Sequence, residues 1–403
     1  MPPELTLIAT VGMTADPILA SIVEHEAQAV VLIASQGSLG TAAKIREEFP
    51  SLQHHVLTLN DAESITESFT KARAALKIAK SWESRAIVAE IAGGTKPMTA
   101  GLVLALSGFG LTFSYVGGME RNPETGRVIP GKERIRTLED PTERFHVGEW
   151  SAFRAAWNGW RMRSAAEVLE NLLRNDTGLS PSEKRFYKHL LLVANGLDAW
   201  DRFHHKKALE LLERGMPVAL AVAEAWHHGA KMRVLGYLEE RLPFLRGLVD
   251  KGNKPTEKLL ADLLANARRR ANAGRYDDAL ARLYRAVALT AEADLYHQTG
   301  IVLHDPTTWP KELPKGYKQQ LEEALGLKNI LDLVFDIQLA LGHKETRAQK
   351  LRGLWGQLEP LLKRRHESIL AHGTRPVEQE DYEAFMAIFE ELGVEEAPPW
   401  PRW

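Results

Sequence analysis

The sequence predicts an α/β domain with a parallel sheet at the N-terminus, followed by two all-α units. In residues 4–145, short apolar runs alternate with amphipathic segments that have helical spacing. Beyond Trp150, apolar residues recur every three or four positions, as in helices that bury one face. The run Asp-Lys-Gly-Asn-Lys-Pro at 250–255 separates two such helical stretches and is the best candidate for a linker.

The N-terminal region is expected to be Rossmann-like. Five apolar runs predict buried strands, at residues 5–11, 30–35, 56–59, 86–92 and 111–116. Helical spacing falls between them, at residues 16–26, 38–48, 61–79 and 97–106. This alternation implies right-handed βαβ crossovers and a parallel sheet covered on both faces. The stretch 117–143, rich in Gly, Pro, Arg and Glu, predicts a hairpin or an irregular loop that leaves the sheet.

The rest of the chain predicts helices only. In the middle unit they fall at 165–173, 183–200, 206–213, 217–228 and 231–238. In the last unit they fall at 256–272, 276–300, 317–325, 329–341, 346–371 and 378–391. The final residues, Ala-Pro-Pro-Trp-Pro-Arg-Trp, cannot be helical, since proline has no N–H to donate. The predicted organisation is a Rossmann-like α/β domain at 1–145, an all-α connecting domain at 146–254, an all-α domain at 255–395 and a tail at 396–403.

Composition excludes several classes of protein. The chain has 403 residues, of which 44% are hydrophobic and 26% charged, as in globular proteins of more than one domain. No run is apolar enough to cross a bilayer and no secretory signal is visible, so a cytoplasmic protein without a membrane partner is expected. The absence of cysteine excludes disulfides, thiolate metal sites and a catalytic cysteine. The net charge of -2 gives no overall attraction to nucleic acid.

Three loops rich in small residues follow predicted strands. They are Thr-Val-Gly-Met-Thr-Ala-Asp at 10–16, Ser-Gln-Gly-Ser-Leu-Gly at 35–40 and Gly-Gly-Thr-Lys-Pro-Met-Thr at 93–99. Glycine lets backbone N–H groups approach a phosphate, and Lys96 adds a full positive charge. Ordinary tight turns are the alternative explanation. Neither a Walker P-loop nor the dinucleotide fingerprint is present, which argues against an NAD-type enzyme and favours another anionic, nucleotide-like ligand.

The first and third of these loops resemble those of the CRISPR-associated Rossmann-fold (CARF) domains. The resemblance covers about 140 residues and implies binding of a cyclic oligoadenylate, a second messenger of type III CRISPR systems. It also implies a two-fold dimer whose paired loops contact the ring, which would be a tetra- or hexa-adenylate. The positions that the resemblance assigns to the ligand are Gly12, Met13, Thr14, Ser35, Gln36, Gly37, Gly94, Thr95, Lys96 and Thr99.

The stretch Arg-His-Glu-Ser-Ile-Leu-Ala-His-Gly at 365–373 is the candidate catalytic site. On a continuous helix Arg365 and His372 would lie two turns apart on one face, separated by about 10 Å of rise. At this separation one arginine and one histidine are too far apart to bind the same phosphate. A second copy of the chain across a dimer axis would bring a second such pair to the site. Gly373 predicts the end of the helix directly after His372.

This stretch resembles the motif of HEPN ribonucleases: arginine, a polar residue, four or five further residues, then histidine. Arg365 matches the arginine, His366 the polar position and His372 the distal histidine. The resemblance implies an obligate homodimer that cuts single-stranded RNA without a metal or cofactor and leaves a 2′,3′-cyclic phosphate. No DNA partner is implied.

Several alternatives assign these residues no role in catalysis or a different one. Arg365 and His372 would be solvated helix residues if the motif arose by chance. Arg364 could replace Arg365, although its spacing to His372 is one residue longer, and Glu367 is more simply a surface carboxylate than an aid to a histidine. A run of arginines is either a solvated face or a surface that steers RNA phosphates, and it comprises Arg268, Arg269, Arg270, Arg275, Arg282 and Arg285.

The sequence therefore predicts a CARF–HEPN ribonuclease activated by a cyclic oligoadenylate. Two rival functions remain open at this stage. One is a ligand-responsive regulatory protein without ribonuclease activity, which would not need Arg365 or His372. The other is a ring nuclease that degrades its own messenger at the N-terminal site, with Thr14 or Thr95 positioning the ring. No metal site is predicted, because the histidine pairs have no acidic partners at ligand spacing.

Overall fold

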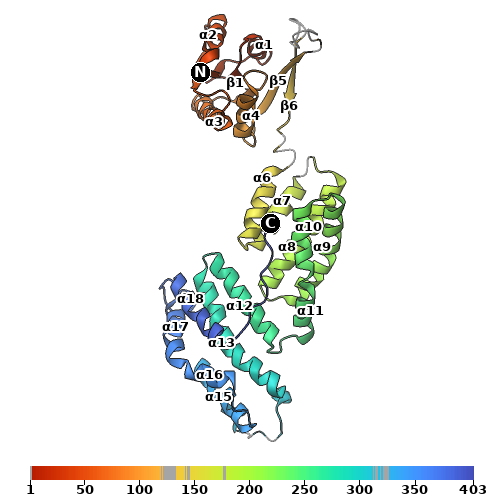
Figure 1. Ribbon diagram of the computed structural model, residues 1–403, viewed down its shortest axis with the longest axis vertical. Helices are drawn as coiled ribbons and strands as arrows, with labels where there is room; N and C mark the ends of the chain where they lie inside the picture. The colour runs from red at the N-terminus through yellow and green to blue at the C-terminus, as the bar shows by residue number, and fades with distance from the viewer. Residues whose placement is uncertain are drawn as a thin grey trace. The chain divides into compact units, whose positions relative to one another are not determined.

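A six-stranded α/β unit precedes a unit built of helices (Figure 1). The computed structural model describes residues 2–118, 120, 133–140, 142, 146–175, 178–311, 313, 316–317, 319–320 and 326–403. The first unit comprises Met1–Trp150 and Thr177–Leu179, and the second comprises Ser151–Asp176 and Ser180–Trp403. In the described ranges, no helix is both long and apolar enough to span a membrane.

The sheet of the first unit has the strand order β3-β2-β1-β4-β5-β6. Its strands are β1 (Leu5–Val11), β2 (Ala29–Ser35), β3 (Gln53–Leu59), β4 (Ala86–Glu90), β5 (Thr112–Gly118) and β6 (Glu133–Leu138). Strands β1 to β5 pair in parallel, and β6 pairs antiparallel with β5. The predicted parallel sheet is confirmed, and β6 is the second arm of a hairpin within 117–143. Residues 119, 121–132, 141 and 143 of that stretch lie outside the described residues.

Among the described residues, the two faces of this sheet are covered by α1 (Asp16–Glu24), α2 (Leu39–Glu48), α3 (Ile65–Ser81) and α4 (Lys96–Leu106). Leu7 and Ala9 point to the face that α1 and α2 cover, whereas Ile8 points to the face of α3 and α4. The helix predicted at 61–79 begins later, because Ser64 is its N-cap and accepts a 3.1 Å hydrogen bond from the N–H of Glu67.

The other helices of the described residues belong to the second unit, except that the first turn of α6 lies in the first unit. They are α6 (Val147–Asn158), α7 (Met162–Arg174), α8 (Pro181–Asp201), α9 (His205–Ala225), α10 (Gly229–Glu239), α11 (Leu242–Lys251), α12 (Glu257–Asn272), α13 (Tyr276–Thr299), α15 (Leu327–Ala340), α16 (Arg347–Gly353), α17 (Trp355–Glu367) and α18 (Gln379–Glu391). The two helices predicted at 206–213 and 217–228 are one helix, α9, with Pro217 inside it. The predicted break at Pro217 was wrong. A proline inside a helix removes one backbone hydrogen bond, and a helix that packs against its neighbours can continue through it. Most of the helix predicted at 317–325 lies outside the described residues.

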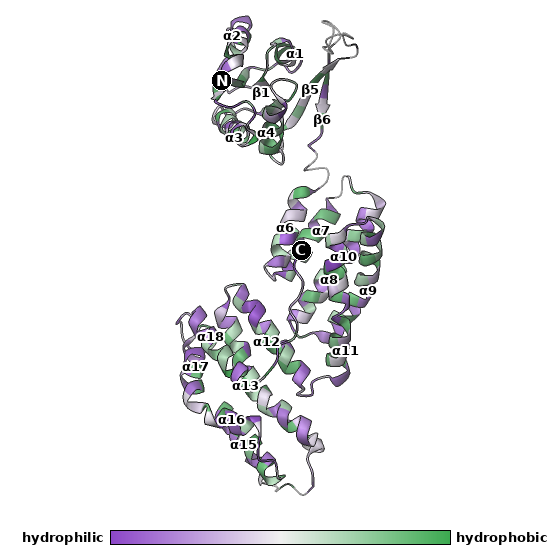
Figure 2. Ribbon diagram, viewed as in Figure 1, coloured by the Kyte–Doolittle hydropathy of each residue, from purple (hydrophilic) through white to green (hydrophobic). Residues whose placement is uncertain are grey.

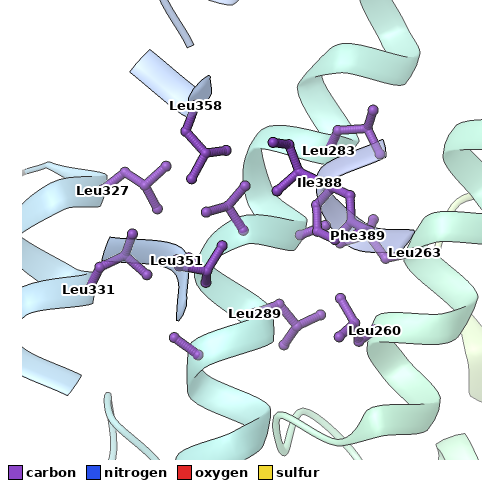
Figure 3. Packing of buried hydrophobic residues seen from close by; sticks show 14 of the residues in the cluster. Leu260, Leu263, Leu283, Leu289, Leu327, Leu331, Leu351, Leu358, Ile388 and Phe389 are labelled. Atoms are coloured by element: carbon purple, nitrogen blue, oxygen red, sulfur yellow. The ribbon is translucent and has the colours of Figure 1, made fainter. Parts of the chain in front are cut away.

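Among the C-terminal helices, α13 is the central one: it contacts α12, α15, α16, α17 and α18. Leucines of these helices meet in one hydrophobic core, shown in Figure 3, in which Leu260, Leu283 and Leu331 are fully buried. Figure 2 shows polar and apolar residues alternating along the same helices, as amphipathic helices require.

The C-terminal segment, predicted as a tail at 396–403, is not helical but packs on the helices. The side chain of Trp400 is 4% exposed, and the Arg269 guanidinium lies 3.9 Å from its ring centroid. Further on, the Trp157 Nε1–H donates to the Pro401 carbonyl at 2.9 Å, and Trp403 N–H donates to Asn158 Oδ1 at 2.8 Å. The last residues therefore belong to the packed structure, joining the end of the chain to α6.

A lysine is buried among aromatic rings in the second unit. The Nζ of Lys231, on α10, lies 4.6 Å from the ring centroids of both Phe186 and Trp226. Burial lowers the pKa of Lys231 to about 8, and the nearby Glu183 acts in the opposite direction. Because the folded protein loses this proton at a lower pH than the unfolded chain, Lys231 makes stability rise with pH above about 8.

Replacing Lys231 with Met is expected to remove that rise. In urea unfolding, the wild-type free energy of unfolding should gain about 2 kcal/mol relative to the variant between roughly pH 7.5 and 9.5. The exposed Lys188, replaced with Met, is the matched control and should follow the wild type. Parallel pH dependences of wild type and Lys231→Met would show that the pKa of Lys231 is not lowered.

Candidate functional sites

Three loops meet at the carboxyl edge of the sheet, and we call residues 12–15, 35–38 and 91–95 the loop cluster. Val11 pairs with Ala34 and Ala9 pairs with Glu90, so the ends of β2 and β4 flank the end of β1. The strand order reverses here, because β1 lies between β2 and β4. Open α/β sheets bind ligands at such a switch point. The structure thus brings the three predicted ligand loops together.

Glycines hold two of these loops in direct contact. A Cβ at Gly12 would lie 2.9 Å from the backbone nitrogen of Gly94, and one at Gly93 would lie 2.2 Å from the Thr10 carbonyl oxygen. Gly94 also has φ +82°, a conformation that disfavours other residues. The buried Thr10, which the sequence analysis did not single out, donates its hydroxyl to the Gly93 carbonyl at 2.7 Å.

Three predicted ligand residues have structural roles within the loop cluster or beside it. The Thr95 hydroxyl accepts from the N–H of Met98 at the start of α4 and donates to the Ala62 carbonyl at 2.5 Å. Thr99 donates to the Gly93 carbonyl at 3.1 Å. Ser35 forms a capping box with Ser38. These hydroxyls fix the shape of the loops, and only their remaining lone pairs could face a ligand.

The exposed side chains of the predicted ligand set are Met13, Thr14, Gln36, Thr95 and Lys96, and Met13 is 80% exposed. Gly12 and Gly94 are partly exposed, and Gly37 is exposed. Lys96 is the first residue of α4, and the helix dipole favours an anion at this end. In this first turn Pro97 has no N–H, and the N–H of Met98 is already bonded to the Thr95 hydroxyl. The loop cluster therefore offers partly exposed glycine backbone, and the start of α4 next to it adds the helix dipole and the exposed cation Lys96.

Glu90 lies beneath the loop cluster and is fully buried at the end of β4. It accepts hydrogen bonds from Ser21 and, at 2.7 Å, from the N–H of Ala92. Burial raises the pKa of Glu90, against hydrogen bonds from Ser21, Ala92, Ser114 and Val116 that lower it. This carboxyl group ties α1 and β5 to the start of the third loop.

The second candidate site is at the end of α17. The predicted helix 346–371 is wrong: α16 ends at Gly353, and α17 ends at Glu367, before the motif is complete. Ser368 has extended backbone, and its hydroxyl donates to the Arg365 carbonyl at 2.9 Å, which satisfies one open acceptor of the last turn. His372 therefore follows a turn and does not lie on the helix of Arg365.

That turn brings the histidines together. The N–H of His372 donates to the His366 carbonyl at 3.2 Å, and the two imidazole rings are parallel within 4° with centroids 6.4 Å apart. Both side chains are exposed. Gly373 is required by this turn, since a Cβ there would lie 2.0 Å from the Glu367 carbonyl oxygen. The two-turn separation predicted from the sequence is thus replaced by a compact arrangement.

The neighbours of the motif have other partners. Arg364 pairs with Asp381 of α18 at 3.6 Å, and Glu367 pairs with Arg375 at 3.2 Å. Arg365 instead places its guanidinium over the ring of Tyr284, 4.7 Å from the centroid. Arg365 is therefore the arginine that remains available to a substrate. Two apolar side chains, Ile369 (69% exposed) and Leu370 (48% exposed), lie between the histidines in sequence.

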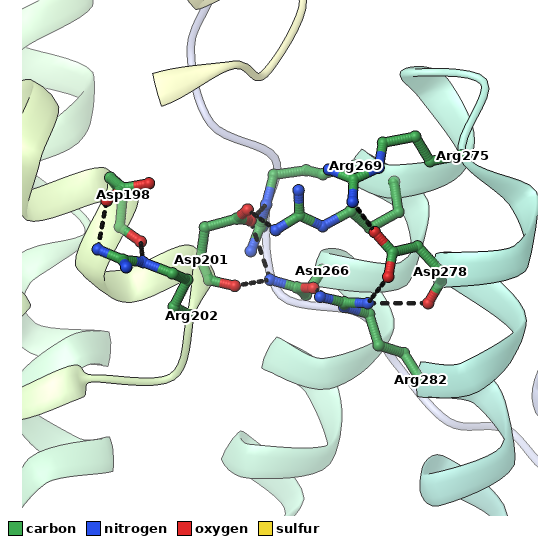
Figure 4. Close-up of polar contacts among 9 residues, drawn as sticks. Asp198, Asp201, Arg202, Asn266, Arg269, Arg275, Asp278 and Arg282 are labelled. Atoms are coloured by element: carbon green, nitrogen blue, oxygen red, sulfur yellow. Dashed lines mark hydrogen bonds and ion pairs between the residues drawn. The ribbon is translucent and has the colours of Figure 1, made fainter. Parts of the chain in front are cut away.

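The predicted basic run on α12 and α13 is not a free basic surface. Asp201 binds Arg269 at 3.0 Å and also pairs with Arg270, while Asn266 donates to Asp201 Oδ1 at 2.9 Å (Figure 4). The other arginines of the run likewise have acidic partners: Arg268 with Glu396, Arg275 and Arg282 with Asp278, and Arg285 with Glu292. Both explanations considered from the sequence are wrong for Arg269, which is buried in a joint between α8 and α12.

Trp200 and His205 extend this joint. The Nε1–H of Trp200 donates to Asp262 at 2.9 Å, and His205 contacts the second oxygen of Asp262 at 3.0 Å. Asp262 is 1% exposed, and these two side chains supply the polar contacts that a buried carboxylate needs.

Within the described part of the chain, no group of three or more His, Asp or Glu residues is placed to hold a metal ion.

Comparison with models of protein families matches two parts of the chain. Residues 145–242 match the Csm6 6H domain, and residues 249–394 match the Csm6 HEPN domain. Together the matched segments cover more than half of the 403 residues. No curated protein matches the chain.

Among solved structures, the chain is similar to Enterococcus italicus Csm6 bound to cyclic hexa-2′-fluoro-hexa-dAMP. The identity is 10% and the TM-score 0.40, over 97% of this chain and 93% of that chain. It is also similar to Can2 from Sulfobacillus thermosulfidooxidans in complex with cyclic tetra-adenylate. There the identity is 12% and the TM-score 0.26, over 47% of this chain and 58% of that chain. These likenesses are distant, and the assignment of the helical domains rests on the two family models.

Proposed function

Because the chain belongs to the Csm6 family by its 6H and HEPN domains, we propose that it is a metal-independent endoribonuclease. It cuts single-stranded RNA when a cyclic oligoadenylate binds the loop cluster, and it serves type III CRISPR antiviral defence. The observation that carries the proposal is that the exposed His366 and His372 rings lie parallel where α17 ends, while the neighbouring Arg365 and His366 both contact the ring of Tyr284.

The chemistry follows from these three side chains. Arg365 binds the scissile phosphate, because a guanidinium offers paired N–H donors and a permanent charge to phosphate oxygens. One histidine takes the proton of the 2′-hydroxyl as that oxygen attacks phosphorus, and a second donates a proton to the leaving 5′-oxygen. The products are a 2′,3′-cyclic phosphate and a 5′-hydroxyl.

We propose that two copies of the chain form the working site. A second α17 end would double the number of arginines and histidines around one phosphate. Ile369 and Leu370 support this proposal, since two exposed apolar side chains beside the motif favour burial against a partner. The 2-fold ligand site implied by the CARF resemblance requires the same homodimer.

An RNA-cleavage assay in EDTA tests the proposed function. A fluorescent single-stranded reporter is incubated with no messenger, cyclic tetra-adenylate or cyclic hexa-adenylate. Cleavage with one of the two rings, leaving cyclic-phosphate ends, is the expected result. Messenger binding without cleavage would indicate the regulatory protein, and loss of the messenger with intact RNA would indicate the ring nuclease. A strict need for added divalent metal would exclude the proposed chemistry.

Replacing Lys96 with Ala should weaken messenger binding. The exposed ammonium group at the start of α4 is expected to make a charge-assisted contact of roughly 1.5–3 kcal/mol with a messenger phosphate. Its loss should raise Kd about 10- to 150-fold per site. Isothermal titration calorimetry with each cyclic oligoadenylate measures this change. The exposed Lys44 of α2, replaced with Ala, is the matched control, and unaltered Kd values for both variants would place the ligand elsewhere.

A further inference from the structure

Tyr284 of α13 contacts two of the three proposed catalytic side chains. Its ring lies under the Arg365 guanidinium, 4.7 Å from ring centroid to Cζ. It also meets the His366 ring edge to face, with centroids 5.9 Å apart and an interplanar angle of 79°. We propose that Tyr284 is a positioning residue that holds Arg365 and His366 in the geometry for RNA cleavage. This inference rests on the proposed function.

The arginines around Arg365 show why an aromatic partner matters. Arg364 and Arg375 on either side of it pair with carboxylates, and so does every arginine of the run on α12 and α13. Arg365 has no carboxylate partner among the described residues, and its Nε is buried without a hydrogen bond. A carboxylate would compete with the RNA phosphate for the guanidinium. The face of Tyr284 orients the same group and leaves its charge uncompensated.

Tyr284 itself is held in place by the core. It is half-buried on α13, between the fully buried Leu283 and Ala286, and packs against the same hydrophobic cluster. Its neighbours along the helix cannot move without disturbing that cluster. The ring is therefore a rigid platform beside a motif that otherwise lies on an exposed turn.

The position of His372 depends on the same platform. The His372 N–H donates to the His366 carbonyl, and the two imidazoles are parallel. A ring that fixes His366 therefore also constrains the turn that carries His372. Loss of the Tyr284 ring is expected to slow turnover more than it weakens RNA binding, because catalytic geometry depends on placement.

Substitutions of Tyr284 test this inference in the full-length protein with its activating cyclic oligoadenylate. Tyr284→Met keeps bulk but removes the aromatic face, and it should lower kcat roughly 3- to 30-fold with a smaller change in KM. Tyr284→Phe keeps the face and should stay within about 3-fold of wild type. Tyr276→Met, on the same helix but in contact with Tyr382, is the matched control and should leave kcat unchanged.

A spectroscopic measurement separates positioning from folding. The proton resonance of His366 Cε1, in protein labelled at histidine, should shift in Tyr284→Met and remain near its wild-type position in Tyr276→Met, because an aromatic ring 5.9 Å away perturbs it. A Tyr284→Met enzyme with wild-type kcat, or a Tyr284→Phe enzyme as slow as Tyr284→Met, would overturn the inference while the ribonuclease stands. An unshifted His366 resonance would overturn it as well. A wild-type protein that cleaves no RNA with either ring would refute the proposed function itself.

Discussion

Replacing His372 with Ala is expected to lower messenger-activated RNA cleavage by about 10²- to 10⁴-fold, the usual contribution of a general acid or base. Arg365→Ala should have an effect of similar size, because it removes the proposed phosphate ligand. The His372 side chain is exposed and follows the end of α17, so its loss should leave the fold intact. The single-turnover rate with a fluorescent RNA measures the effect.

The control for this prediction is His304→Ala. His304 is another exposed histidine in the segment matched by the HEPN model, and it lies outside the motif. The variants at His304 and His372 should bind messenger with wild-type affinity and unfold at the same temperature. Wild-type cleavage rates in both His372→Ala and Arg365→Ala would remove this site from consideration and leave the regulatory function standing.

Replacing Asp201 with Ala is expected to destabilise the helical unit by about 3–5 kcal/mol, since it leaves the buried Arg269 and the partly buried Arg270 without this counter-charge. Arg269 is 5% exposed and bonds Asp201 at 3.0 Å, while Asn266 loses an acceptor at the same time. Urea unfolding followed by circular dichroism measures the change. The ion pairs on the exposed surface of the same unit should contribute far less.

Asp198→Ala provides the comparison, because Asp198 lies one turn earlier on α8. It pairs with Arg202, whose side chain is 55% exposed, so its replacement should cost about 0.3–0.5 kcal/mol. Equal losses in the two variants would mean that the Asp201 cluster does not hold α8 and α12 together. A larger loss in Asp198→Ala would contradict the account of this joint.

The fold was predictable where the sequence pattern is local. The apolar runs and the helices between them determine the parallel sheet, and the residues of β1 were predicted without error. The predicted HEPN domain is confirmed by the Csm6 HEPN family model, which matches residues 249–394. Helix continuity was less predictable: Pro217 interrupts nothing in α9, whereas α17 ends at Glu367 without a glycine or proline.

The geometry of the candidate sites could not be predicted from the sequence. The motif selected Arg365, His366 and His372 as candidates, but no residue pattern indicated the turn that places His372 beside His366. The Tyr284 ring was not predicted either, because it lies 81 positions before Arg365 along the printed sequence and belongs to another helix. Similarly, Asp201 lies 68 residues before Arg269 in the sequence. Counting charges only near Arg269 therefore suggests a basic surface, whereas the arginine is buried in a network with Asp201.

The close packing of the loop cluster limits how its ligand preference can diverge. Gly12 and Gly93 have no space for a Cβ, and Gly94 has a conformation that other residues disfavour, so these backbone positions cannot change independently of one another. Variation without rebuilding the sheet edge is confined to the outward side chains, chiefly Met13, Gln36 and Lys96. Under the proposed function, relatives that read messengers of different ring size should therefore share the glycine framework and differ at these three exposed positions.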